Sequence, residues 1–150
     1  MFRVFFSTTV LALASSVATA ETITVCLDGS CDYTDIQDAV DAAEHLDVIE
    51  VGPGTYYPEE TITTPYTGVK TLRGSVDKNG YPTTIIDGQG AMGVINCSQS
   101  SAWTFENLLI TGGNAILGGG AYCAYPASMG FDNCVFLQNS ASNAGGGLFC

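Results

Sequence analysis

The pattern of apolar and polar positions begins with one amphipathic helix. Between residues 36 and 43, apolar residues recur at the spacing of a single helical face, namely Ile36, Ala39, Val40 and Ala43. Thr34 and Gln37 have the spacing of a capping box, in which the Thr34 hydroxyl caps the first turn and Gln37 reaches back. We therefore expect a helix with Thr34 as its N-cap that ends near His45.

The chain after this helix has the pattern of short strands. Runs of β-branched residues occupy residues 48–51, 62–64, 69–72 and 83–86. Turn-forming clusters such as Gly52-Pro53-Gly54 and Asp77-Lys78-Asn79-Gly80 follow or separate these runs. The 18 glycines in 150 residues also favour a turn-rich β architecture over a helical bundle.

An internal repeat in the C-terminal part is the strongest signal in the chain. Gly118-Gly-Gly-Ala-Tyr-Cys123 recurs 27 residues later as Gly145-Gly-Gly-Leu-Phe-Cys150. Phe105-Glu-Asn-Leu-Leu-Ile110 recurs 26 residues later as Phe131-Asp-Asn-Cys-Val-Phe136. A weaker copy over residues 93–97 places Cys97 26 residues before Cys123. A fixed period of this length is typical of a solenoid, whereas a β-sandwich, the competing fold, has no such self-similarity.

Stacked coils of this length form a parallel β-helix, in which each strand pairs with its counterpart one coil away. Strand alternation then places Tyr122 and Phe149 outside, together with Asn96. The same alternation predicts inward pairs at Ile95/Cys97, Ala121/Cys123, Leu148/Cys150, Leu108/Ile110 and Cys134/Phe136. Cys97, Cys123 and Cys150 would thus form a core ladder of thiols. Asn107 and Asn133 would stack as an Asn ladder at a bend, because Asn tolerates left-handed backbone angles.

The first twenty residues have the features of a secretory signal peptide. A basic start at Arg3 precedes an apolar run, and Ala18-Thr19-Ala20 fits the small-x-small cleavage rule. The apolar run is too short to span a bilayer as a helix, and no longer one follows. We expect cleavage after Ala20 and a secreted or cell-surface protein without a transmembrane helix. The predicted organisation is a signal peptide at 1–20, a cap region with the helix at 21–46, and β-helix coils at 47–150.

Charge and cysteine content narrow the function classes. The net charge is −11, with only 4 Lys and Arg, which argues against a nucleic-acid partner. Cys26 and Cys31 bracket a short turn and are the best disulfide candidates in an oxidising compartment. Structural zinc is the competing interpretation, but paired Cys-x-x-Cys spacing is absent and His45 is the only histidine.

Several segments carry a resemblance to a known superfamily. Residues 36–44 and 47–56 resemble the N-terminal cap and first coil of pectin-lyase-like right-handed parallel β-helix proteins. Residues 84–90 and 105–115, with the Gly-Gly-Gly copies, resemble secreted bacterial right-handed β-helix repeat proteins. The last segment is also similar to the repeats of chlamydial polymorphic outer-membrane proteins. The resemblance implies an all-β right-handed solenoid, but a fold does not determine an activity.

The superfamily includes polysaccharide lyases and glycoside hydrolases, which makes an enzyme the alternative function. A polyuronate lyase needs a basic side chain to take a proton and a cation such as Ca²⁺ to neutralise the substrate carboxylate. Lys70 and Arg73 are the only weak candidates, and solvated surface charge is the preferred interpretation of both. The Asn-Thr-Asp and Asp-Asp motifs of polygalacturonases are absent.

The preferred function is a non-enzymatic structural, adhesive or carbohydrate-binding scaffold. Tyr122 and Phe149 would align on one flat face, where exposed aromatic rings suit a polysaccharide or a cell-surface protein, although β-propensity alone also explains them. No cofactor is expected, although Ca²⁺ could bind loosely among Asp28, Asp32 and Asp35. Because the repeat stops at Cys150 without a cap, we expect a truncated chain with a longer parent.

Overall fold

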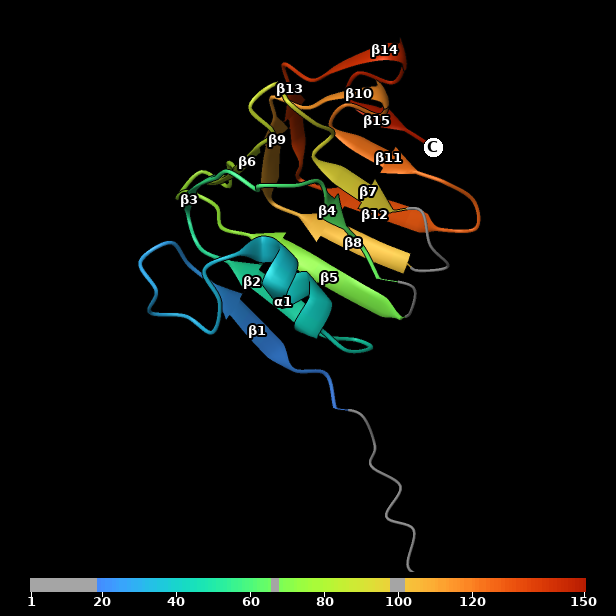
Figure 1. Cartoon of the computed structure of the whole chain (residues 1–150). Helices are drawn as coiled ribbons and strands as arrows, with labels where there is room; N and C mark the ends of the chain where they lie inside the picture. Colours follow the sequence, from blue (N-terminus) through green and yellow to red (C-terminus); the bar gives the residue numbers. More distant parts are fainter. Residues whose placement is uncertain (1–18, 66–67, 98–101) are drawn as a thin grey trace, which may run out of the picture.

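The computed structural model describes residues 19–65, 68–97 and 102–150, and it is a parallel β-solenoid (Figure 1). All ladders between its labelled strands are parallel. Sheet A has five strands in the order β1-β2-β5-β8-β12, so the chain passes this face five times. The predicted all-β parallel β-helix with one short helix is therefore confirmed.

Three further sheets complete the walls of the solenoid. The strands of sheet A are β1 (Thr22–Val25), β2 (Val48–Val51), β5 (Val69–Gly74), β8 (Ala102–Glu106) and β12 (Ser128–Asp132). Sheet B contains β3 (Gly54–Tyr56), β6 (Thr84–Asp87), β9 (Leu108–Thr111) and β13 (Val135–Leu137). Sheet C contains β4 (Ile62–Thr63), β7 (Ile95–Cys97), β11 (Ala121–Cys123) and β15 (Leu148–Phe149). A two-stranded sheet pairs β10 (Asn114–Leu117) with β14 (Ser140–Ala144).

Helix α1 (Ile36–Ala42) lies at the end of the solenoid that carries β1 (Figure 1). Its N-cap is Asp35, whose side chain accepts from the backbone N–H groups of Gln37 and Asp38. The predicted N-cap at Thr34 is therefore wrong by one residue, since Asp is as good a cap and sits one position closer. The helix also ends at Ala42, before the predicted end near His45.

Gln37 seals the free edge of β4 against further pairing. Its Oε1 accepts from the Thr63 backbone N–H at 2.8 Å, and its Nε2 donates to the Thr63 carbonyl at 3.1 Å. The side-chain amide thus replaces the missing strand of the first coil. An unpaired strand edge is a template for association, so this pair of bonds protects the edge.

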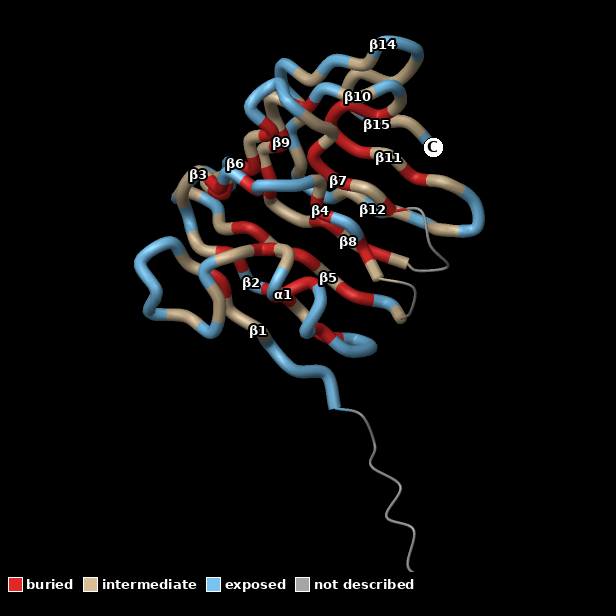
Figure 2. The backbone as a smooth tube through the Cα atoms, viewed as in Figure 1, coloured by how far each residue is buried: buried red, intermediate tan, exposed pale blue. Residues whose placement is uncertain are grey.

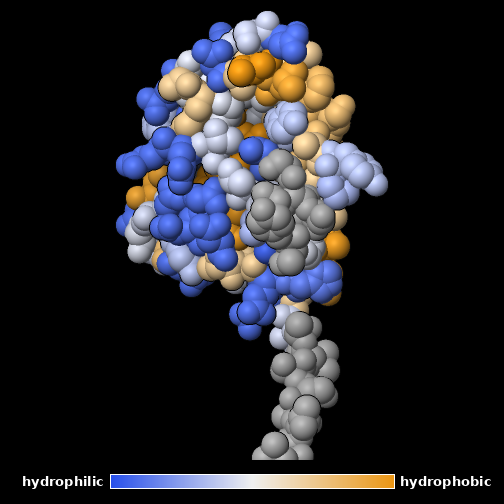
Figure 3. Space-filling view, turned by 45° about the vertical axis from the view of Figure 1, so that its right-hand side comes forward, coloured by the Kyte–Doolittle hydropathy of each residue, from blue (hydrophilic) through white to orange (hydrophobic). Residues whose placement is uncertain are grey.

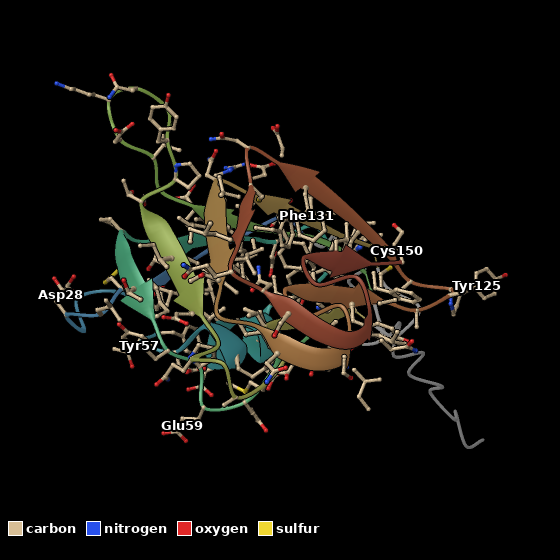
Figure 4. The ribbon with its side chains drawn as sticks, turned by 90° about the horizontal axis from the view of Figure 1, so that it is seen from above. Asp28, Tyr57, Glu59, Tyr125, Phe131 and Cys150 are labelled. Carbon is tan, nitrogen blue, oxygen red and sulfur yellow. A yellow bond between two sulfur atoms is a disulfide. The ribbon has the colours of Figure 1, made fainter. Side chains whose placement is uncertain are left out.

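The core consists of columns of inward side chains that continue from coil to coil. In sheet A the register aligns Ile49, Leu72, Phe105 and Phe131. The first three are at most 1% exposed, and the Phe105 and Phe131 rings stack at 5.2 Å between centroids. Figure 4 shows Phe131 among the strands, whereas Tyr125 extends away from them. The columns make each coil dependent on its neighbours for burial.

Burial falls off toward the last coil, as Figure 2 shows. Leu148 continues the column of Ala121 in register but is 41% exposed, and Cys150 is also exposed. Leu148 therefore keeps the predicted inward position without being buried, and Cys150 does not extend the buried thiol ladder of Cys97 and Cys123. Cys134 and Phe136 are only partly buried for the same reason, since no described strand covers this coil from the other side.

The two Asn residues of the repeat occupy the same bend in successive coils. Asn107 and Asn133 have φ values of 58° and 48°, in the left-handed region. The Asn133 Nδ2 donates to the Asn107 Oδ1 at 2.8 Å and to the Gly80 carbonyl at 2.8 Å. The amides therefore link the coils at this bend.

Candidate functional site

The outer face of sheet C carries a row of four aligned side chains. The register places Thr63, Asn96, Tyr122 and Phe149 next to one another across β4, β7, β11 and β15. The Tyr122 and Phe149 rings are nearly parallel, at 11°, with centroids 5.9 Å apart. Both side chains are partly exposed, so this aromatic row forms an amphipathic strip near the last coil.

Exposed apolar side chains surround the same end of the molecule. Ile116 is 71% and Tyr125 98% exposed, in addition to Leu148. Figure 3 shows hydrophobic surface gathered at this upper end, whereas hydrophilic surface dominates much of the lower part in that view. Contiguous exposed apolar surface is typical of a binding face. The exposed apolar side chains and the aromatic row therefore lie together at the end with the last two coils.

Arg73 lies in a row of alternating charge on the outer face of sheet A. The register aligns Glu50, Arg73 and Glu106. The Arg73 Nε donates to Glu106 Oε2 at 2.6 Å, and the Arg73 Nη1 lies 3.6 Å from Glu50 Oε1. The bond to Glu106 is the main cause that raises the pKa of Arg73 further, with burial opposing it. A guanidinium held in this way is a poor proton acceptor.

A shallow cleft lies beside this charged row. Its volume is about 510 Å³, and its lining includes Glu50, Arg73 and Ser75. The Ser75 hydroxyl already donates to the Val51 carbonyl at 3.0 Å. No activated nucleophile is therefore formed by these three residues.

Lys70 is buried, which corrects the prediction of a solvated surface charge. It is 3% exposed and lies, like Leu72, on the inner side of β5. Its Nζ lies 5.5 Å from the centroid of the Trp103 ring, which occupies the paired position on β8. Burial lowers the pKa of Lys70, and the negative charge of Asp47 opposes this shift. The ring stabilises the buried ammonium by a cation–π contact.

Asp47 is a buried acid that sequence reasoning missed. It is 5% exposed and precedes β2, one coil before Lys70. Its Oδ1 accepts from the Glu21 backbone N–H at 2.8 Å, and its Oδ2 accepts from the Glu44 backbone N–H at 2.7 Å. Lys70 lies two residues before Leu72, so both side chains face the same side of β5. This spacing was the signal in the sequence for the interior cluster. A basic side chain that faces the interior requires a nearby acid, because an unpaired buried charge is costly.

The three acids of the predicted calcium loop form hydrogen bonds with different partners. Asp28 Oδ1 accepts from the Ser30 backbone N–H and hydroxyl at 3.0 and 2.7 Å. Asp32 Oδ2 accepts from Thr24 at 2.9 and 2.6 Å, and Asp35 caps the helix. The side-chain hydrogen bonds are the largest cause that lowers the pKa of Asp28 and of Asp32. Within the described ranges, no three His, Cys, Asp or Glu side chains converge as a metal site.

Of the six cysteines, two form a disulfide, two are buried in the solenoid, Cys134 is partly buried and Cys150 is exposed. Cys26 and Cys31 form the predicted disulfide, which closes the loop beyond β1 where Figure 4 labels Asp28. Cys97 and Cys123 are buried and aligned in register between β7 and β11. Burial, and then the neighbouring Cys150, raises the pKa of Cys123 to about 12. Both thiols fill space as small apolar side chains, and its raised pKa makes Cys123 a poor nucleophile.

Comparison with known proteins finds no matching family model, no matching curated protein and no matching solved structure. A search of the described residues for membrane-spanning helices finds no helix that is long and apolar enough.

Proposed function

We propose that this chain is a secreted or cell-surface structural scaffold whose sheet C binds a neutral polysaccharide through Tyr122 and Phe149. The observation that carries the proposal is the nearly parallel pair of partly exposed rings on neighbouring strands of sheet C. Apolar ring surface stacks well on the C–H faces of sugars, and a solenoid holds its rings at fixed positions. Asn96 and Thr63 continue the row as polar side chains, and the Thr63 hydroxyl donates to the Thr61 carbonyl at 3.2 Å.

Charge favours a neutral sugar polymer over a polyuronate. The net charge of −11 repels an anionic polymer in the absence of divalent cations. An adhesive protein partner is the competing use of the same strip. Kinship with pectin-lyase-like and polymorphic outer-membrane β-helix proteins, including a right-handed coil, remains part of the proposal and is supported by the parallel solenoid.

The enzyme alternative receives no support from the two basic candidates. Lys70 lies inside the solenoid against Trp103, and Arg73 is held by two glutamates. A lyase base must reach the substrate within hydrogen-bonding distance. In the described residues, neither group is placed to do so.

Affinity electrophoresis in gels that contain a soluble neutral polysaccharide tests the proposal. A β-glucan and a galactomannan are compared with polygalacturonate, with and without Ca²⁺. We expect retardation in a neutral polymer and about tenfold weaker binding for Tyr122→Ala and for Phe149→Ala. Tyr81→Ala is the matched control, because Tyr81 is a 68% exposed loop aromatic outside the row.

Three results would overturn the proposal. The first is migration unaffected by any of the polymers, and the second is equal binding by all the variants. The third is release of unsaturated products from polygalacturonate, which would show the lyase alternative instead.

A further inference from the structure

The peptide bond between Ala20 and Glu21 lies in an exposed segment directly before β1. Thr19, Ala20 and Glu21 are all exposed, whereas Val25 at the far end of β1 is fully buried. The segment that precedes Glu21 carries the small-x-small pattern of Ala18 and Ala20. Residues 1–18 lie outside the described part of the chain, but the bond itself is within it and open to a protease.

Glu21 is the first residue that the solenoid holds in place. Its backbone nitrogen donates to Asp47 Oδ1 at 2.8 Å, and its carbonyl accepts from the Val48 backbone N–H at 3.0 Å. The nitrogen that cleavage would free is therefore already positioned against a carboxylate. Thr19 and Ala20, in contrast, are exposed and lie outside the coils.

Asp47 is well suited to receive a positive charge. It is 5% exposed, and both ion pairs of the described residues belong to Arg73. A carboxylate has about four acceptor positions, and the backbone N–H groups of Glu21 and Glu44 fill two of them. Lys70, one coil away, interacts with it through charge and not through a direct contact. A buried carboxylate without a close cation is costly, so a new cation there is stabilising.

We propose that cleavage after Ala20 creates an N-terminal ammonium on Glu21 that forms an ion pair with buried Asp47 and thereby stabilises the exported solenoid. An endopeptidase hydrolyses the Ala20–Glu21 bond with one water. The C–N bond breaks, Ala20 leaves as a carboxylate, and the Glu21 nitrogen becomes an ammonium at neutral pH. A single neutral N–H donor against Asp47 is thus replaced by a charged donor, which forms a hydrogen bond about twice as strong.

The pair completes a column of alternating charge through the first coils. The ammonium of Glu21, the carboxylate of Asp47, the ammonium of Lys70 and the ring of Trp103 follow one another from the first coil to the fourth. Before cleavage, this column ends in a neutral amide. Processing and the stability of the fold are therefore coupled through Asp47.

Two chains that differ only at the N-terminus test the proposal. One begins at Glu21 and the other at Thr19, both released from a removable fusion partner, and both contain every labelled strand. In the longer chain, the Glu21 nitrogen stays an amide and the ammonium moves out to Thr19. At pH 7 we expect the unfolding equilibrium constant of the Glu21 chain, from urea titration, to be about tenfold lower. Asp47→Asn in both chains should remove this difference.

The pH dependence provides a second readout with a definite sign. Asp47 should raise the pKa of the new amino group above its ordinary value of about 7.7–8.0. The advantage of the Glu21 chain is then complete below that ordinary value and is lost as the pH rises through the raised pKa. Other charged groups near this column are Lys70, the carboxylates of Asp41 and Glu44, which act on Lys70, and the carboxylate of Glu21 itself.

Equal unfolding constants for the two chains would overturn the ion pair, and so would an equal difference in the Asp47→Asn chains. The cleavage half of the proposal is tested separately by N-terminal sequencing of the full chain after export. The sequence should begin at Glu21, and any other start would contradict it. These outcomes are independent of polysaccharide binding.

Discussion

The face assignment of β11 can be tested by placing a charge at Cys123. Cys123 is 7% exposed and faces the interior, aligned with Cys97 one coil earlier. Aspartate is close to cysteine in size, so Cys123→Asp mainly adds a carboxylate to an apolar site. The effective cost of burying an unpaired ion is several kcal/mol. We expect the free energy of unfolding to fall by about 3–5 kcal/mol and the midpoint temperature by about 10 °C or more.

Two matched variants separate charge burial from other effects. Cys123→Ala leaves a small cavity and should cost about 1 kcal/mol. Tyr122→Asp places the same charge on the outer face of the same strand and should also cost about 1 kcal/mol. The Cys123→Asp loss should shrink as the pH falls, because burial raises the pKa of the new carboxyl and protonation below that pKa removes the buried charge.

The assay is urea and thermal unfolding followed by circular dichroism, without reductant so that the Cys26–Cys31 disulfide stays intact. A Cys123→Asp protein that unfolds within 1 kcal/mol of the parent (about fivefold in the equilibrium constant) would refute the reasoning. A larger loss for Tyr122→Asp than for Cys123→Asp would refute it as well. Either result would mean that the inner and outer faces of sheet C are exchanged.

Three further predictions concern the bonds between coils. Asn133→Ala should cost about 1–3 kcal/mol, because it removes the bond to Asn107 and strains a left-handed residue; Asn133→Gly should recover part of the loss in urea titrations. Gln37→Leu should expose the β4 edge at Thr63 and cause concentration-dependent association in size-exclusion chromatography, and a monomer at every concentration would contradict this. Arg73→Met should cost only about 0.2–1 kcal/mol, and the difference should vanish near about 1 M salt.

The fold could be predicted because the repeated positions hold residues with special backbone or packing requirements. The first glycine of each Gly-Gly-Gly copy, Gly118 and Gly145, has a positive φ of 59° and 68°. Asn107 and Asn133 need the same region of backbone angles one coil apart. Their spacing therefore gives the register directly. The strands β10 and β14 were missed, because Ser-, Asn- and Ala-rich segments show no alternation that marks a strand.

The interior charges were harder to predict than the fold. Lys70 is spaced to face the same side as Leu72, but the general rule that lysines are exposed favoured a surface position for it. Asp47 precedes its strand and shows no pattern, so its role depends on contacts across 26 residues of chain. Strand alternation predicts only the side to which Leu148 points. Leu148 is exposed because burial also requires a neighbouring coil that covers it. The aromatic row, by contrast, could be predicted from strand alternation and the repeat alone.

Nuclear Overhauser contacts between backbone protons test the stacked coils most directly. The account predicts contacts between residues 26 apart in the last two coils of sheets A and B, such as Phe105 with Phe131 and Leu109 with Val135. It predicts a 27-residue offset in sheet C, between Ala121 and Leu148. Contacts in an antiparallel pattern between strands adjacent in sequence, as in the hairpins of a β-sandwich, would contradict the solenoid.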